Sequence, residues 1–156
     1  VLADKPALAL DSWQWLEVTS GVASIVSGTV EQFVPQMINF ELVGGVNFKK
    51  GCYPGQEVVA RSQYLGKLKR RAVLAQVDAV ASAGQEIFTT EDPGQPCGMV
   101  VNAAPSPTSG YAALIETKLA ALSGAGLHLG APDGPLLSLV ELPYALPDDA
   151  AESPAA

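Results

Sequence analysis

A cysteine that directly precedes a predicted helix is the strongest chemical feature of the sequence. Residues 49–61 read KKGCYPGQEVVAR, and Cys52 lies two residues before a helix predicted over residues 54–61. The N-terminus of a helix carries about half a positive charge, which favours a thiolate over a thiol. Cys52 is therefore a candidate reactive thiol. The alternative is an inert cysteine at a tight turn, and both interpretations stay open because the sequence shows no base partner.

The neighbours of Cys52 have the properties of an anion-binding loop. Lys50 lies two residues from Cys52, next to Lys49, and both ammonium groups favour a nearby anion. Gly51 and Gly55 let the backbone approach a ligand closely. Their amides could join the helix N-terminus in holding an anionic group.

Basic residues gather around this segment. Residues 49–71 hold seven of the nine Lys and Arg side chains against one acid, Glu57, which gives +6, while the rest of the chain carries −13. This asymmetry predicts a local anion site and not general affinity for nucleic acid, with a solvated surface as the alternative. Glu57 lies one helical turn before Arg61, so we expect these two side chains to pair on one helix face.

Other chemically active side chains are few. Cys97 lies 45 residues from Cys52, and without a secretory signal we expect two free thiols in a reducing compartment, the cytoplasm. We expect Cys97 in a hydrophobic core and His128 at the surface. One histidine and no CxxC pair cannot make a Cys/His zinc site within the chain, so no metal is expected. No apolar run approaches the roughly 18–20 residues that span a bilayer, so we expect no membrane partner.

The elements that must position these side chains change in character along the chain. Residues 11–20 fit a short helix or a strand, Pro35 marks a turn or helix start, and residues 44–48 read as a turn into a short strand. After Gly66, short β-branched segments alternate with Gly, Pro, Asp and Ser, which indicates an antiparallel barrel or sandwich. A helix over residues 112–122 competes with one strand. The predicted strands are residues 69–77, 85–89, 98–103, 111–117, 127–129 and 136–142.

This change of character divides the chain. We expect residues 1–65 to be part of one domain, residues 66–146 to form a β-barrel domain, and residues 147–156 to be a disordered tail. Val1 is neither an initiator Met nor the start of a signal peptide, so we expect a fragment that lacks an N-terminal portion. An open half-pocket in such a fragment would expose apolar surface and favour dimerisation.

Residues 50–61 also resemble a family signature. The pattern K-G-C-Y-x-G-Q-E-x-x-A-R is similar to that of YgfZ-type folate-binding proteins. This family includes bacterial proteins named for tRNA modification and mitochondrial relatives that serve iron–sulfur protein maturation, and it is related to the T-protein aminomethyltransferase. Three flanking segments agree with the family. They are Phe33-Val34-Pro35-Gln36 with Asn39, Tyr64-x-Gly66 followed by Lys69-Arg70, and Leu142-Pro143-Tyr144-x-Leu146.

The resemblance implies an α+β fold, in which the C-terminal part of an aminomethyltransferase-like folate-binding fold (residues 1–65) precedes a small antiparallel β-barrel. It implies tetrahydrofolate as cofactor, and iron–sulfur enzymes or assembly factors as partners. The protein would support assembly or repair of iron–sulfur clusters, including those of enzymes that modify tRNA. The implied roles are catalytic for Cys52 and Lys50, and cofactor-binding for Glu17, Gly51, Tyr53, Gly55, Gln56 and Arg61.

One position departs from the family. Relatives have the Glu of an E-A-G sequence where this chain has Thr19-Ser20-Gly21, and a hydroxyl cannot accept from a pterin as a carboxylate does. Glu17 would share a face with Thr19 in a strand and could replace that carboxylate. Trp13 and Trp15 would also share one face of a strand, and we interpret them as packing residues.

Two other functions compete with the accessory role, and whether the protein is an enzyme stays open. A folate-dependent aminomethyltransferase is the main alternative, although the cysteine signature marks the YgfZ branch of the resemblance. Direct tRNA binding is the weaker alternative. The basic residues of segment 67–71 favour it, but the −13 of the remaining chain should repel a polyanion.

Overall fold

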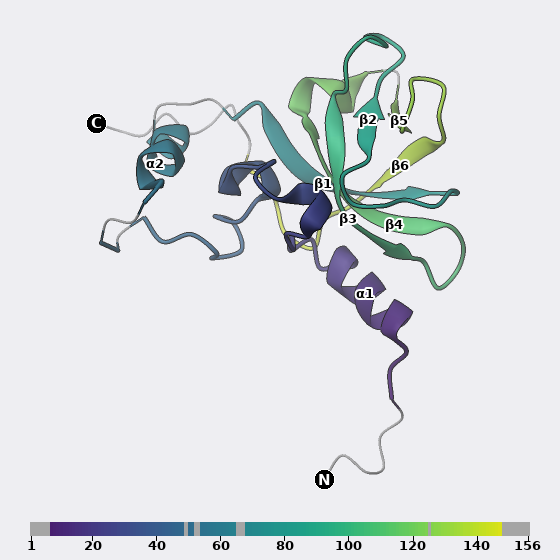
Figure 1. Cartoon of the computed structure of the whole chain (residues 1–156), viewed down its shortest axis with the longest axis horizontal. Coiled ribbons are helices and arrows are strands. Elements are labelled where there is room, and N and C mark those ends of the chain that lie inside the picture. Colours follow the sequence, from purple (N-terminus) through teal and green to yellow (C-terminus); the bar gives the residue numbers. More distant parts are fainter. Residues whose placement is uncertain (1–6, 49, 52–53, 65–67, 125, 148–156) are drawn as a thin grey trace.

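The computed structural model describes residues 7–48, 50–51, 54–64, 68–124 and 126–147 of the chain. Two α-helices and two short 3₁₀ turns precede six strands, and a third 3₁₀ turn lies between the fourth and fifth strands (Figure 1). The helices are α1 (Leu10–Thr19) and α2 (Gln56–Tyr64), and the 3₁₀ turns are η1 (Ser27–Thr29), η2 (Pro35–Ile38) and η3 (Leu119–Ser123). The strands are β1 (Arg70–Val77), β2 (Glu86–Phe88), β3 (Gly98–Pro105), β4 (Tyr111–Lys118), β5 (Leu127–Leu129) and β6 (Leu136–Val140).

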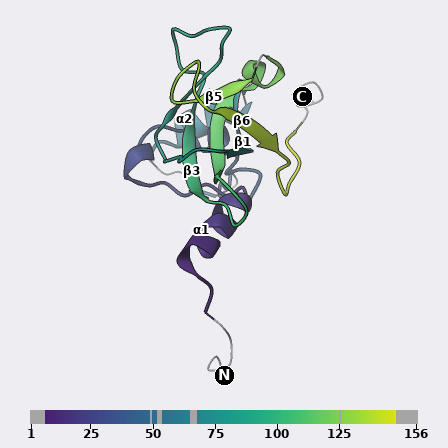
Figure 2. The ribbon, with the colours of Figure 1, turned by 90° about the vertical axis from the view of Figure 1, so that its right-hand side faces the viewer.

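The six strands close into an antiparallel barrel in the order β1-β4-β3-β2-β5-β6, which leaves no open sheet edge (Figures 1 and 2). The prediction of a small antiparallel barrel after helical segments is therefore confirmed. All six predicted strands form, and the alternative prediction of a helix over residues 112–122 is wrong. β4 occupies most of that range, and only the 3₁₀ turn Leu119–Ser123 is helical. β4 pairs along its whole length with β1, so cross-strand packing overrides the local helix propensity.

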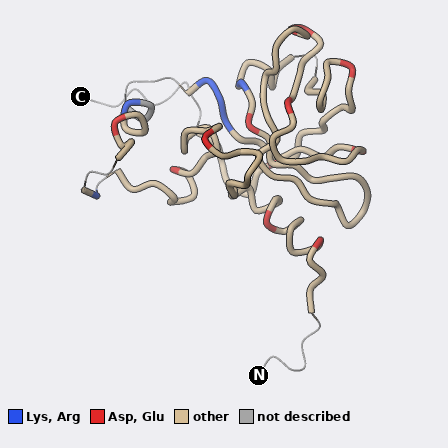
Figure 3. The backbone as a smooth tube through the Cα atoms, in the orientation of Figure 1, with Lys and Arg blue, Asp and Glu red and all other residues tan. Residues whose placement is uncertain are grey.

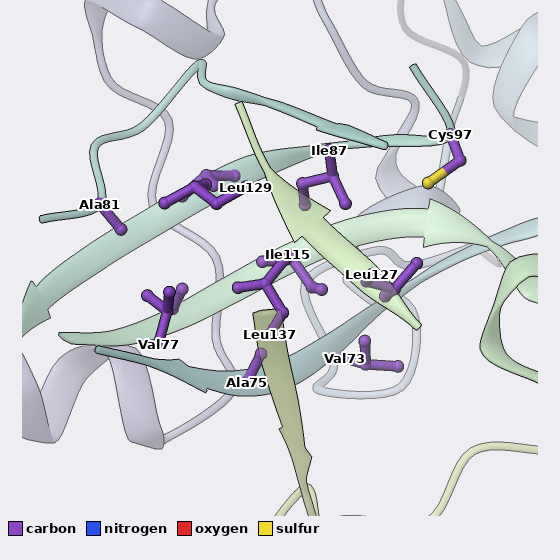
Figure 4. Packing of buried hydrophobic residues seen from close by; sticks show 12 residues of the cluster. Val73, Ala75, Val77, Ala81, Ile87, Cys97, Ile115, Leu127, Leu129 and Leu137 are labelled. Carbon is purple, nitrogen blue, oxygen red and sulfur yellow. The ribbon is translucent and has the colours of Figure 1, made fainter. Parts of the chain in front are cut away.

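Both faces of β1 are buried, which explains its nearly continuous apolar sequence. One face, including Val73 and Ala75, packs inside the barrel (Figure 4). The other face, including Ala72 and Leu74, belongs to a second core that contains Val18 of α1. Cys97 lies in the barrel core as predicted, with 5% of its surface exposed, and it is a free thiol.

Residues 11–20 form a helix and not a strand. α1 packs against β3 and β4 and ends before Gly21, which has the positive φ of 70° that favours glycine at a helix terminus. Residues two apart in a helix do not share a face, so the strand-based pairing of Trp13 with Trp15 is wrong. Trp15 packs on the second core, whereas Trp13 is 55% exposed.

Two further local predictions are wrong. Residues 44–48 contain no strand; instead, the Gly45 amide donates to the Phe40 carbonyl at 2.7 Å and closes a turn. His128 is not a surface residue of a loop but a half-buried residue of β5, with Nδ1 2.8 Å from the Gly134 carbonyl. Pro35 opens η2 as predicted for a helix start.

Among the residues that the structure describes, no helix has the length and apolarity needed to cross a membrane.

We expect Leu114→Ala to lower the free energy of unfolding by about 2–5 kcal/mol, because it opens a cavity at a fully buried site of β4. Leu136→Ala is the matched control, since Leu136 is 56% exposed, and we expect it to cost less than about 0.5 kcal/mol. Urea unfolding followed by circular dichroism measures both. Equal effects of the two substitutions would contradict this placement of the core.

Candidate functional site

The helix predicted after the cysteine forms, and it starts at Gln56. Gly51 and Lys50 lie exposed before it, while Cys52 and Tyr53 lie outside the described residues. Gly55 has a φ of 84°, so the backbone itself requires glycine immediately before the helix. An added Cβ at Gly51 or Gly55 would meet no atom within 4 Å among the described residues. These glycines therefore border open space.

The predicted pairing of Glu57 with Arg61 is absent. Both side chains are exposed, and among the described residues no ion pair joins them. An exposed pair at this spacing gains only about 0.3–0.5 kcal/mol against the entropy of two long side chains. The Arg61 guanidinium is thus not engaged by Glu57.

Among the described residues, α2 contacts the rest of the chain at η2. Val59 is buried, at 9% exposure, and the Gln36 side-chain amide donates to the Val59 carbonyl at 2.7 Å. Gln36 is fully buried and belongs to η2. Figure 1 shows α2 beside η2, away from the barrel wall. The position of α2 therefore depends on that of η2.

A buried polar cluster fixes η2 against the barrel. We call it the polar joint and define it as Asn39, Glu41, Arg71 and Tyr144. The Arg71 guanidinium donates to a Glu41 carboxylate oxygen and, at 3.1 Å, to the backbone carbonyl of residue 36. Asn39 Nδ2 donates to the Ala72 carbonyl at 2.9 Å and to the Tyr144 hydroxyl at 3.2 Å. The Tyr144 hydroxyl in turn donates to the carbonyl of Gly21 at 2.6 Å.

The joint brings together four segments that are remote in sequence: the end of α1, the η2 region, β1 and the C-terminal L-P-Y segment. The side chains of Arg71 and Glu41 are only 6% and 8% exposed. Burying a charge is costly unless a partner and hydrogen bonds compensate it. The joint therefore requires all its members, which makes the relative placement of these segments specific.

The basic segment is less basic in space than in sequence. Arg71 is neutralised by Glu41, and Arg70 donates through Nε and Nη2 to the two oxygens of Glu116, with Nη2 to Oε2 at 2.7 Å. The hydrogen bond to Glu116 raises the pKa of Arg70 above its ordinary value, while burial acts in the opposite direction. Figure 3 shows Lys and Arg positions at α2, on the loop before it and at the start of β1, where β1 itself begins with the two paired arginines. The exposed cations described there are Lys50, Arg61 and Lys69.

Glu17 lies apart from the other predicted site residues. It is exposed on α1 and borders a cavity of about 180 Å³ with Gln14 and Ser24. Because the segment is a helix, Glu17 does not share a face with Thr19, and the Thr19 hydroxyl bonds to the Trp15 carbonyl at 2.9 Å. The prediction that Glu17 replaces the family carboxylate at position 19 assumed a strand, and it is therefore wrong.

Most of the predicted site residues that the structure describes already lie close together in sequence; they are Lys50, Gly51, Gly55, Gln56 and Arg61. The structure does not bring Glu17 close to them. Figures 1 and 2 show α1 and α2 on different sides of the molecule. The members of the polar joint were not predicted as a site. The sequence features that could have indicated them are the three flanking motifs, which contain Asn39 and Tyr144. The sequence alone could not show that these motifs meet in space.

Comparison with known proteins gives a partial similarity. No family model matches the chain. It is similar to the tRNA-modifying protein YgfZ of Colwellia psychrerythraea strain 34H, with 48% identity over 65 residues. The match covers 42% of this chain and 20% of that protein, so the chain spans only about a fifth of the relative's length in the aligned part. The similarity supports a YgfZ-like character for that part of the chain.

We expect Tyr144→Phe to lower the free energy of unfolding by about 1–3 kcal/mol, because the carbonyl of the buried Gly21 then loses its hydrogen-bond donor. Tyr111→Phe is the matched control, since among the described residues no hydrogen bond of the Tyr111 hydroxyl is found. Burial raises the pKa of Tyr144 above its ordinary value, and the hydrogen bond from Asn39 opposes this.

The raised pKa sets the direction of a pH effect on the same variant. Below about pH 10 the phenol is neutral in both folded and unfolded chains, and its contribution to stability is complete. As the pH rises through the folded-state pKa, that contribution is lost. Urea unfolding at pH 8 and at alkaline pH should therefore show a gap between the native chain and Tyr144→Phe that narrows as the pH rises. A constant gap would contradict the burial of this hydroxyl.

Proposed function

We propose that the chain is part of a folate-binding accessory protein that supports assembly or repair of iron–sulfur clusters, including clusters of enzymes that modify tRNA. The observation that carries this proposal is the signature over residues 50–61, together with the 48% identity to a protein named for tRNA modification. The described geometry is compatible with it. A glycine-bordered loop with exposed cations leads into α2.

Cys52 is the proposed reactive thiol, with Lys50 as the cation that favours its thiolate. The exposed Lys50 ammonium and the Arg61 guanidinium suit the anionic glutamate tail of tetrahydrofolate. Gly51, Tyr53, Gly55 and Gln56 are the further proposed ligand contacts.

Glu17 does not fit one pocket with these residues, because it lies on α1 away from α2. The residues described thus do not form a complete folate pocket. We assign folate binding to the longer protein, in which a further part of the pocket would face the loop and α2.

Three further proposals concern the domain boundary, the cell compartment and the partners. We place the domain boundary between residues 65 and 66 and the protein in the cytoplasm, where free thiols such as that of Cys97 persist. Iron–sulfur enzymes or assembly factors are the proposed partners. No contact of the described residues favours the alternative of a folate-dependent aminomethyltransferase.

Rescue of cells that lack the full-length protein tests the role of the thiol. We would restore the intact protein, Cys52→Ala or Cys97→Ala, and measure tRNA methylthiolation by an iron–sulfur enzyme. We expect Cys52→Ala to lose most of the rescue. The matched control Cys97→Ala should retain it, because that thiol is buried in the barrel core.

The result depends on equal amounts of folded protein, which immunoblotting of the soluble fraction checks. Full rescue by Cys52→Ala at equal abundance would contradict the proposed thiol mechanism. Loss of rescue by all variants, intact protein included, would contradict the accessory function itself.

A further inference from the structure

The two methionines of the chain line one cavity. Met37 belongs to η2 and Met99 to β3. The cavity has a volume of about 280 Å³, and the ion pair of Arg70 and Glu116 also lines it. Neither methionine is a member of the two hydrophobic cores described for the chain. The thioethers therefore gather where η2 meets the outer wall of the barrel.

Both methionines are half-buried. A fully buried thioether is shielded from oxidants, whereas a fully exposed one has no packing to lose. The cavity is much larger than the roughly 30 Å³ that one water molecule occupies in the liquid, so it has room for an oxidant as small as hydrogen peroxide. These two side chains thus combine access for a small oxidant with contacts that need an apolar group.

The surroundings of Met99 are unfavourable for an oxidised sulfur. Met99 pairs across the sheet with Glu86 on one side and Glu116 on the other, and such directly opposite residues share a face. A sulfoxide oxygen and a carboxylate are both acceptors. The charged donor of the cavity is Arg70, which already bonds both oxygens of Glu116. A sulfoxide that bonds to Arg70 competes with Glu116, which is 2% exposed, and one that does not must turn to water.

Met37 lies between two residues that hold η2 in place. Gln36 is fully buried and donates to the Val59 carbonyl of α2 at 2.7 Å. Ile38 is 3% exposed and belongs to the second core. Oxidation turns the apolar Met37 side chain into a polar one that favours water over the cavity wall. It therefore opposes the seating of η2, and α2 is attached to η2.

We propose that Met37 and Met99 form an oxidation site for hydrogen peroxide, and that their sulfoxides release η2, together with α2, from the barrel. Each thioether sulfur takes one oxygen atom from the peroxide and loses two electrons. The O–O bond breaks, and the peroxide leaves as water. Methionine sulfoxide reductases reverse the change. The site involves neither Cys52 nor folate, so it goes beyond the function proposed above.

Peptide mass spectrometry after peroxide treatment tests access to the site. It would be applied to the 156-residue chain and to the full-length protein. We expect both methionines to gain one oxygen atom, at a rate within about tenfold of that in the urea-unfolded chain. Stronger protection of either methionine in the full-length protein would overturn the proposal, because the rest of the protein would then cover the cavity.

Limited trypsin cleavage measures the release of η2. Arg61 is exposed on α2, which η2 carries, whereas Lys118 ends β4 of the barrel. We expect oxidation to speed cleavage after Arg61 about threefold or more, because cleavage follows the population of the opened segment. Cleavage after Lys118 should stay within about 1.5-fold. Treatment with the two methionine sulfoxide reductases should restore the original rate at Arg61.

The double variant Met37→Leu, Met99→Leu is the matched control. Leucine conserves the apolar volume, and the variant keeps both cysteines, Cys52 and Cys97. We expect peroxide to leave its cleavage at Arg61 unchanged, and circular dichroism checks that it is folded. Acceleration in this variant would assign the effect to a group other than the methionines. Unchanged cleavage of the oxidised native chain, or equal acceleration at Lys118, would equally overturn the release of η2.

Discussion

The buried guanidinium of Arg71 constrains the rest of this structure. It comes from the second residue of β1 and lies under the η2 region, where it donates to Glu41 and to a backbone carbonyl of η2. Removing a charge from water costs several kcal/mol, and here the opposite charge of Glu41 and the hydrogen bond to the η2 carbonyl offset that cost. The chain must therefore bring Glu41 and η2 to the barrel wherever β1 forms. The segment that leads to Cys52 follows directly from there.

From the Arg71–Glu41 ion pair, hydrogen bonds connect to further residues in two directions. Asn39 connects it to the Tyr144 hydroxyl and thereby to the carbonyl of Gly21 at the end of α1. Gln36 connects it to the Val59 carbonyl of α2. The positions of both helices thus depend on one cluster next to β1. The barrel acts as the rigid support, and the loop with Lys50 and Gly51 is carried by elements attached to it.

How far the sequence predicted this structure depends on the range of the interactions concerned. The strands were predicted because β-branched segments alternate with Gly and Pro, which is a local signal. The helix α1 was not distinguished from a strand, since residues 11–20 mix Trp, Val and Thr with polar residues, and packing on β3 and β4 decides its form. The polar joint was beyond prediction, because its bond from Tyr144 to Gly21 spans 123 residues.

Long-range contacts also limit how well the exposed charge can be predicted from the sequence. Counting residues 49–71 gave a strongly basic segment, but Arg70 and Arg71 are paired with acids 46 and 30 residues away. A sequence count cannot distinguish a paired guanidinium from an exposed one. The candidate site is consequently narrower than predicted, with Lys50, Arg61 and Lys69 as its described exposed cations. Gly55 was predicted for close approach of a ligand to the backbone, which stays a prediction; its φ of 84° adds a conformational reason for glycine that the sequence-based prediction did not use.

A double-mutant cycle on the buried ion pair tests most directly whether the joint holds the structure together. The free energy of unfolding would be measured in urea for Arg71→Met, Glu41→Leu and the double variant. We expect each single substitution to cost about 3–5 kcal/mol, because it leaves one buried charge without its partner. The double variant should cost less than the sum by well over 1 kcal/mol. Costs that add to within about 0.5 kcal/mol would contradict the account, because Arg71 and Glu41 would then act independently.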